Sequence, residues 1–150
     1  MPHLSMTGPL GLLTIVEDRG AIVALEWGRA GGGGSTPLLE EARAQLDAYF
    51  DGRLKAFDLP LAPIGSAFQR AVWDEMWRIP YGQTRTYGDV AARLKSAPRA
   101  VGGACGRNPI PVIQPCLRVV GAGGRLGGYS GGAGTETKRA LLRLEGFLLA

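Results

Sequence analysis

The chain has 150 residues, of which 45% are hydrophobic and 20% are charged, so it can fold as one ordinary domain or two small ones. No apolar run approaches the roughly 20 residues that cross a bilayer, and Met1-Pro2-His3-Leu4 does not resemble a secretory signal. A single histidine and two cysteines exclude four-cysteine and histidine-rich metal sites, and they favour a reduced, cytoplasmic or nucleoid-associated protein.

The net charge of +4 is unevenly distributed along the chain. Residues 1–60 hold 5 Lys/Arg and 8 Asp/Glu, a balance of −3, whereas residues 61–150 hold 12 Lys/Arg and 5 Asp/Glu, a balance of +7. A basic half attracts polyanions, so nucleic acid is the first candidate partner. A basic domain that binds no nucleic acid is an equal alternative on charge alone.

The first part of the chain predicts a small sheet and one helix. The β-branched, apolar residues 14–16 and 22–27 flank Glu-Asp-Arg-Gly, a pattern typical of a β-hairpin. Gly31-Gly32-Gly33-Gly34-Ser35 has the composition of a flexible linker. Apolar side chains at helical spacing predict a helix from Leu38 to about Phe50. Prolines 60 and 63 then mark an extended connector, so we expect an N-terminal domain over residues 1–62.

Residues 63–150 predict a mainly helical domain. Ser66 is a candidate N-cap for a first helix. Two short helices follow, one on the apolar stripe that begins at Tyr87 and one over residues 97–107, and such a pair is typical of a helix-turn-helix. A last helix begins at Gly134 or Thr135, with Ala140, Leu141 and Leu144 directed inward. The predicted fold class is therefore α+β, a small sheet-plus-helix domain followed by a mainly helical one.

The helix over residues 97–107 has an almost bare surface. Its interior carries Ala100, Gly102, Gly103, Ala104 and Gly106, and each glycine costs about 1 kcal/mol inside a helix. A close partner would compensate for this cost. That partner is either a nucleic-acid backbone or groove, or another helix packed tightly against this one.

The densest motif surrounds Cys116. Three prolines between residues 109 and 115 hold the backbone extended, and a β-branched run follows, so Cys116 is predicted at the start of a short buried strand. An inert core cysteine is the alternative. The glycine-rich residues 121–134 come next, either as a linker or as a loop of bare backbone that closes over a flat ligand.

Phe68 through Gly146 is similar to the DNA-binding and active-site domain of the O6-alkylguanine-DNA alkyltransferases, also called methylated-DNA–protein-cysteine methyltransferases. The segments that carry the resemblance are Phe68-Gln69-Arg70-Ala71-Val72-Trp73, Ile79-Pro80-Tyr81-Gly82, Thr86-Tyr87-Gly88-Asp89-Val90-Ala91, Arg99-Ala100-Val101-Gly102-Gly103-Ala104, Arg107-Asn108-Pro109-Ile110-Pro111, Pro115-Cys116, Arg118-Val119-Val120, Gly127-Gly128-Tyr129-Ser130-Gly131-Gly132 and Leu144-Glu145-Gly146.

The resemblance implies a single-turnover DNA repair enzyme. Cys116 would take the alkyl group from O6-alkylguanine, with O4-alkylthymine as an alternative base, and the thioether would not be reversed. A base must leave the stack before a cysteine can reach it. We expect a monomer that acts on double-stranded DNA containing alkylated guanine, with no cofactor and no membrane. A metal in the N-terminal domain is not expected, because the cysteines and histidine that would bind it are absent there.

The resemblance also implies roles for individual residues. Tyr87 would press on the phosphate 3′ to the target, and Arg99 would fill the gap left by the flipped base. Asn108 would brace the turn before Cys116, and Glu145 would end a hydrogen-bond relay. The remaining residues form two groups, the DNA-facing helix residues Ala100, Gly102, Gly103 and Arg107, and the guanine-pocket residues Val119, Tyr129, Ser130 and Gly131.

One position departs from the family motif Pro-Cys-His-Arg-Val. The chain has Leu117 where the family has the histidine that accepts the cysteine proton through a water. Leucine cannot accept a proton, so the resemblance implies slowed transfer and a Glu145 without its partner. Thiolate formation would then depend on helix dipoles, Arg118 or Tyr129, and a thiol of ordinary pKa is still a few per cent ionised at neutral pH.

Three alternatives to ordinary repair stay open. An engineered variant of this scaffold, for self-labelling or new cysteine chemistry, is favoured mildly by the linker over residues 31–35. A lesion binder without repair activity usually lacks the cysteine, and Cys116 is present. A plain helix-turn-helix regulator would need neither Pro115-Cys116 nor the glycine-rich segment, and it would carry large polar side chains on its third helix.

Overall fold

The fold is taken from a computed structural model, which describes residues 1–28, 31, 33–126 and 134–147. The chain divides into two compact units, Met1–Ile64 and Gly65–Ala150. The mixed α/β architecture confirms the predicted fold class. The expected domain boundary, between residues 62 and 63, lies in the connector that joins these units.

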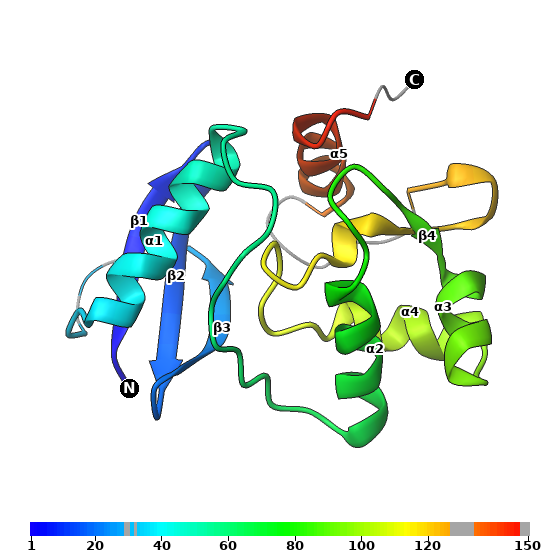
Figure 1. Cartoon of the computed structure of the whole chain (residues 1–150), viewed down its shortest axis with the longest axis horizontal. Helices are drawn as coiled ribbons and strands as arrows, with labels where there is room; N and C mark the ends of the chain where they lie inside the picture. Colours follow the sequence, from blue (N-terminus) through cyan, green and yellow to red (C-terminus); the bar gives the residue numbers. More distant parts are fainter. Residues whose placement is uncertain (29–30, 32, 127–133, 148–150) are drawn as a thin grey trace. The chain divides into compact units, whose positions relative to one another are not determined.

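The first unit is a three-stranded antiparallel sheet with one helix (Figure 1). Strands β1 (His3–Gly8), β2 (Gly11–Asp18) and β3 (Ala21–Trp27) follow in that order across the sheet. Thr36 is the N-cap of helix α1 (Pro37–Phe50), and its side chain accepts a hydrogen bond from Leu39 N. The helix packs on β1 and β2. The apolar side chains of β2 and α1, among them Leu13, Ile15 and Leu46, are fully buried in this unit.

The predicted hairpin is present as β2 and β3, and the predicted helix as α1. Strand β1 was not predicted. Its signal is the alternation His3-Leu4-Ser5-Met6-Thr7, in which Leu4 and Met6 are buried and their neighbours are not. The strand is short and pairs with β2 through Leu4 and Ile15, so its stability comes from the sheet rather than from its own sequence.

The second unit is built on three helices that pack side by side (Figure 1). They are α2 (Ala67–Trp77), α3 (Tyr87–Leu94) and α4 (Pro98–Gly106), and α3 and α4 form the predicted helix-turn-helix. Ser66 and Thr86 each begin a helix with a complete capping box. Trp73 anchors α2 to α4 because its buried indole Nε1 donates to Ala104 O at 2.9 Å.

The backbone around Cys116 differs from the prediction. Cys116 does not start a strand, because residues Cys116–Arg118 form a 3₁₀ turn and strand β5 (Val119–Val120) begins only afterwards. The prolines also do not hold an extended chain throughout. The segment turns sharply at Val112, which is buried and has φ of 73°, a conformation that costs a β-branched residue energy.

Strand β5 pairs in parallel with β4 (Arg85–Thr86), with Arg85 opposite Val119 and Thr86 opposite Val120. The final helix, α5 (Thr135–Leu144), packs on the Cys116 turn. Its buried residues are Thr137, Lys138, Leu141 and Leu142. Of the three residues predicted to point inward, Leu141 is buried, whereas Ala140 and Leu144 are only partly buried. Among the described helices, none is long and apolar enough to span a membrane.

Candidate functional site

Asn108 holds the turn that precedes Cys116. Its Nδ2 donates to Gln114 O at 2.8 Å, and its Oδ1 accepts from Ile110 N at 3.0 Å and from Gln114 Nε2 at 2.8 Å. One side chain therefore joins both ends of the turn. Since Gln114 is also buried, its backbone and side chain find partners inside the turn instead of in solvent.

Cys116 lies in the core of the second unit with only 7% of its surface exposed. It belongs to the same buried cluster as Val119 and Cys105, and Tyr87 packs against this cluster from the start of α3. The pairing of β4 with β5 explains this arrangement, because Tyr87 directly follows β4 and Cys116 lies just before β5. The site therefore joins two segments that are far apart in the sequence.

Leu117 is fully buried, and it offers no group that could carry a proton. The expectation that Glu145 lacks a partner as a result is wrong. Arg118 Nε donates to Glu145 Oε1 at 2.9 Å and Arg118 Nη2 donates to Glu145 Oε2 at 3.0 Å, a bidentate pair that is almost wholly buried. Arg118 also donates to Ile79 O at 2.7 Å. The two side chains thus hold each other in a charge-assisted pair beside the Cys116 turn.

Lys138 is a site residue that the sequence did not reveal. It is fully buried, and its Nζ donates to Val119 O at 2.6 Å and to Tyr87 Oη at 3.5 Å. Burial lowers its pKa, while the nearby Cys116 and Cys105 act in the opposite direction. The available signal was a basic residue one turn before the inward Leu141 and Leu142 on an amphipathic helix.

The other two ionisable groups of this cluster resist ionisation. Burial raises the pKa of Tyr87 to about 12, and the neighbouring Cys105 and Cys116 add to this effect. Burial also raises the pKa of Cys105 to about 12, again with a contribution from Cys116. At neutral pH both groups are therefore protonated. Cys105 contacts Met76 Sδ at 3.6 Å, as a core thiol would.

Helix α4 divides cleanly into a buried and an exposed side. Val101, Ala104 and Cys105 are buried, whereas Arg99, Ala100 and Gly103 are exposed, and Arg107 follows at the C-cap. A Cβ atom on Gly103 would meet nothing within 4 Å, so nothing inside this unit requires a glycine there. At Gly102 the same atom would lie 4.0 Å from the Tyr87 ring, which is ordinary contact.

Tyr129, Ser130 and Gly131, which the resemblance places in the guanine pocket, lie outside the described residues. Within the described ranges, no group of three or more His, Cys, Asp or Glu side chains could hold a metal ion.

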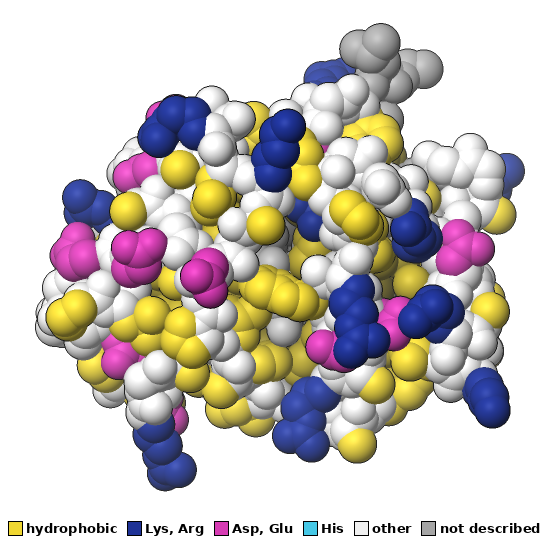
Figure 2. All heavy atoms as spheres, viewed as in Figure 1, with side chains coloured by type: hydrophobic (Ala, Val, Ile, Leu, Met, Phe, Trp, Pro, Cys, Tyr) yellow, Lys and Arg dark blue, Asp and Glu magenta, His cyan; other side chains and the backbone are white. Residues whose placement is uncertain are grey.

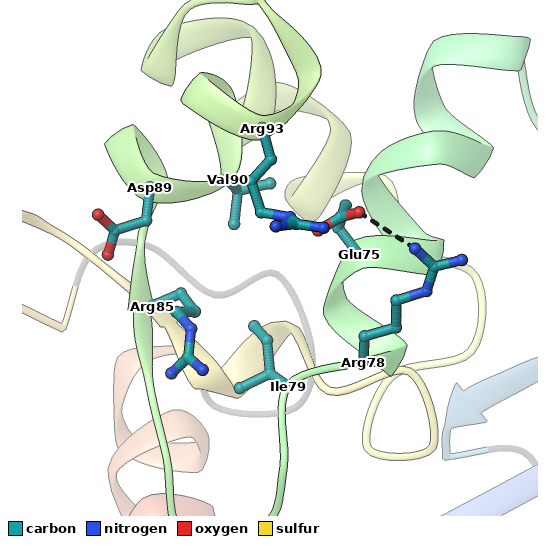
Figure 3. A pocket seen from close by; sticks show the side chains of 7 residues that line it. All are labelled: Glu75, Arg78, Ile79, Arg85, Asp89, Val90 and Arg93. Carbon is teal, nitrogen blue, oxygen red and sulfur yellow. Dashed lines mark hydrogen bonds and ion pairs between the residues drawn. The ribbon is translucent and has the colours of Figure 1, made fainter.

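A hollow on the surface lies between α2, β4 and α3 (Figure 3). Its lining includes three arginines, and two of them pair with Glu75, which accepts from Arg93 Nε at 2.7 Å and lies 3.5 Å from Arg78 Nη1. Asp89 on the other side accepts from Thr86 N in the capping box, which lowers its pKa. The contact between Arg93 and Glu75 joins α3 to α2. None of the predicted site residues lines the hollow.

Two family models together match most of the chain. Residues 4–63 match the ribonuclease-like domain of 6-O-methylguanine DNA methyltransferase, and residues 67–147 match its DNA-binding domain. The chain is 54% identical over 111 residues to a methylated-DNA–protein-cysteine methyltransferase of Methanosarcina acetivorans, covering 73% of this chain and 70% of that protein. It is 44% identical over 136 residues to the enzyme of the same name from Methanosarcina mazei, covering 89% and 82%.

Solved structures give the same result. The chain superposes on a Mycobacterium tuberculosis OGT in complex with DNA with a TM-score of 0.87 and 40% identity, over 97% of this chain and 92% of the other. An O6-methylguanine DNA methyltransferase from Methanococcus jannaschii matches with a TM-score of 0.70 and 28% identity, over 98% of this chain and 95% of the other.

Proposed function

The chain belongs to the 6-O-methylguanine DNA methyltransferase family, and we propose from this premise that Cys116 accepts an alkyl group from the O6 position of guanine in double-stranded DNA. The enzyme activity is that of a methylated-DNA–protein-cysteine methyltransferase, which acts in DNA repair. The finer assignments, to O6-alkylguanine as the preferred lesion, to O4-alkylthymine as a second one and to a monomer as the acting form, are part of this proposal.

The reaction is a single displacement at the alkyl carbon. The Cys116 thiolate forms an S–C bond while the C–O6 bond breaks, and the electron pair of that bond stays on the guanine, which takes up a proton from water. Water does not cleave the S–C bond of the thioether, so the thiol is not regenerated and each protein molecule reacts once. No cofactor enters this balance, because the alkyl group comes from the DNA itself.

The burial of Cys116 requires the base to move to the cysteine. A thiol that is 7% exposed cannot reach an atom inside a stacked duplex, so the target nucleotide has to be extruded. We assign Tyr87 to the phosphate 3′ to the target and Arg99 to the gap in the duplex. Both lie on the helix-turn-helix, Tyr87 as the first residue of α3 and Arg99 near the start of α4.

The exposed side of α4 fits close approach to a DNA groove. Ala100, Gly102 and Gly103 present almost no side chain, and Arg99 and Arg107 supply positive charge at the two ends of the helix. We assign residues 63–150 to DNA binding and alkyl transfer, and residues 1–62 to a supporting N-terminal domain. Val119, Tyr129, Ser130 and Gly131 complete the proposal as the lining of the guanine pocket.

The observation that carries the proposal is the position of Cys116. It follows the turn that Asn108 holds, and it belongs to the same buried cluster as residues of the helix-turn-helix, against which Tyr87 packs. The test is to incubate the full chain with duplex DNA that contains O6-methylguanine, and then to measure its intact mass and map its peptides. We expect one added methyl group, on Cys116, and none in Cys116→Ser.

Cys105→Ser is the matched control, because Cys105 is equally buried and stays protonated. It should still gain one methyl group. An unchanged mass of the parent chain together with tight lesion binding would instead identify a non-repairing lesion binder. Preference for an unmodified sequence would identify a regulator.

A further inference from the structure

The substitution at Leu117 leaves open which group receives the Cys116 proton. Leu117 has no titratable atom, and Arg118 and Glu145 are tied to each other in a buried bidentate pair. Three ionisable groups of the described residues interact electrostatically with the thiol, namely Tyr87 from α3, Cys105 from α4 and Lys138 from α5.

The geometry favours Lys138 within this set. The Nζ atom donates to the carbonyl of Val119, the first residue after the Cys116 turn, and it lies 5.6 Å from the centre of the Tyr87 ring. A fully buried lysine is rare, because removal of an ammonium from water is unfavourable unless charged or polar groups compensate. The Val119 carbonyl and the more distant Tyr87 hydroxyl stabilise a full positive charge only modestly. A thiolate beside the ammonium would stabilise it much more.

The protonation states of the neighbours support the same choice. The pKa values of Tyr87 and Cys105 are both raised to about 12, so neither group gains or loses a proton near neutral pH. Burial lowers the pKa of Lys138, which favours the neutral amine, while the neighbouring Cys116 and Cys105 act in the opposite direction. Among these three described groups, Lys138 is therefore the one whose pKa shift favours uptake of a proton near neutral pH.

We propose that Lys138 takes up the proton of Cys116 in place of the missing histidine. The S–H bond breaks and an N–H bond forms on Nζ, which leaves a thiolate stabilised by the adjacent ammonium. This inference rests on the proposed function, since it concerns the activation of the same cysteine. Lys138 acts through the ionisation of Cys116 and does not touch the alkyl group.

The first experiment measures how fast Cys116 of the full chain reacts with iodoacetamide as a function of pH, with the site identified by peptide mapping. In Lys138→Met, which keeps an unbranched side chain and removes the amine with its charge, the midpoint of the profile should rise by about one pH unit or more. The rate at pH 7 should then fall about tenfold. Arg143→Met is the matched control, because it removes an exposed charge from the same helix and should leave the profile unchanged. Coinciding profiles of Lys138→Met and the parent chain would overturn the proposal.

A second variant shows whether Lys138→Met lowers the reactivity of Cys116 because it removes the proton acceptor or because it disturbs the structure. Adding Leu117→His to Lys138→Met supplies the imidazole that the family uses, and it should restore a large part of the Cys116 reactivity at pH 7. A structural defect at position 138 would not be repaired by a histidine next to Cys116, so the absence of any recovery would count against the proposal.

A third measurement needs no substitution. The 15N NMR signal of the Lys138 amine is followed through a pH titration of the parent chain, before and after Cys116 is capped with iodoacetamide. Capping removes the thiolate, so the titration midpoint of Lys138 should fall, and an unchanged midpoint would refute the pairing. These readouts use no alkylated DNA. If they succeed while methyl transfer to Cys116 fails, the proposed function is wrong and the Lys138–Cys116 pair stands.

Discussion

At the scale of single residues, Leu117 and the ion pair of Arg118 with Glu145 lie next to Cys116 in the fold and distinguish this site. Leu117 fills a fully buried position where an imidazole would have to be hydrated or hydrogen-bonded. Glu145 accepts two hydrogen bonds from Arg118, whose third donor holds the carbonyl of Ile79. Glu145 is therefore a positioning residue, since it secures the Cys116 turn through Arg118.

This pair predicts a large loss of stability in Glu145→Gln. The substitution leaves the Arg118 guanidinium buried with no opposing charge, and breaking such a pair costs about 3–5 kcal/mol. The free energy of unfolding, measured in urea, should fall by about that amount.

The exposed pair of Asp74 and Arg78 provides the control for this prediction. Its atoms are 3.0 Å apart, but both side chains are about 60% exposed. Asp74→Asn should therefore cost about 1 kcal/mol or less. Equal losses in the two variants would show that the Arg118–Glu145 pair does not hold the turn.

At the scale of elements, α4 has a composition that its own fold does not require. Its buried side explains Val101 and Ala104, but the exposed Gly103 has open space around it. A glycine at this position lowers the stability of the helix and improves no packing inside this unit. A partner that approaches the backbone closely would explain it, because a side chain would prevent that approach.

This argument predicts opposite effects of Gly103→Ala on stability and on DNA binding. The added methyl group meets nothing inside this unit, so the variant should unfold with a free energy about 1 kcal/mol higher. Its affinity for duplex DNA should fall, because the helix can no longer approach as closely. Thermal melts and fluorescence anisotropy measure the two quantities, and a gain in both would remove α4 from the DNA interface.

At the scale of the whole molecule, charge separates the two units. On the face drawn in Figure 2, acidic side chains gather over the first unit, whereas Lys and Arg side chains outnumber them over the second. This agrees with the balance of −3 over residues 1–60 and +7 over residues 61–150. The second unit, which holds Cys116 and the helix-turn-helix, is the one suited to a polyanion.

We expect the affinity for duplex DNA to fall steeply with salt, because each phosphate contact releases counterions. Arg107→Ala, at the C-cap of α4, should reduce the slope of log affinity against log salt by about 0.9 and weaken binding equally for different sequences. The measurement is a salt titration of binding to two unrelated duplexes. An unchanged slope would place Arg107 outside the phosphate contacts.

The sequence by itself determined the elements whose signals are local. The β2–β3 hairpin, α1, the cap at Ser66 and the helix-turn-helix follow from alternation, helical spacing and capping chemistry between neighbours in the chain. The family resemblance likewise came from local motifs between Phe68 and Gly146, and the family comparisons confirm it.

Only the tertiary structure decided what lies around the thiol. The 3₁₀ turn at Cys116 and the two-residue strands β4 and β5 are too short to be specified by local propensity, and they form because distant segments pair. The partners Arg118 with Glu145, and Lys138 with Val119, are 27 and 19 residues apart. Electrostatic contacts in a low-dielectric core depend on distance in space, and the order of residues in the chain does not encode that distance.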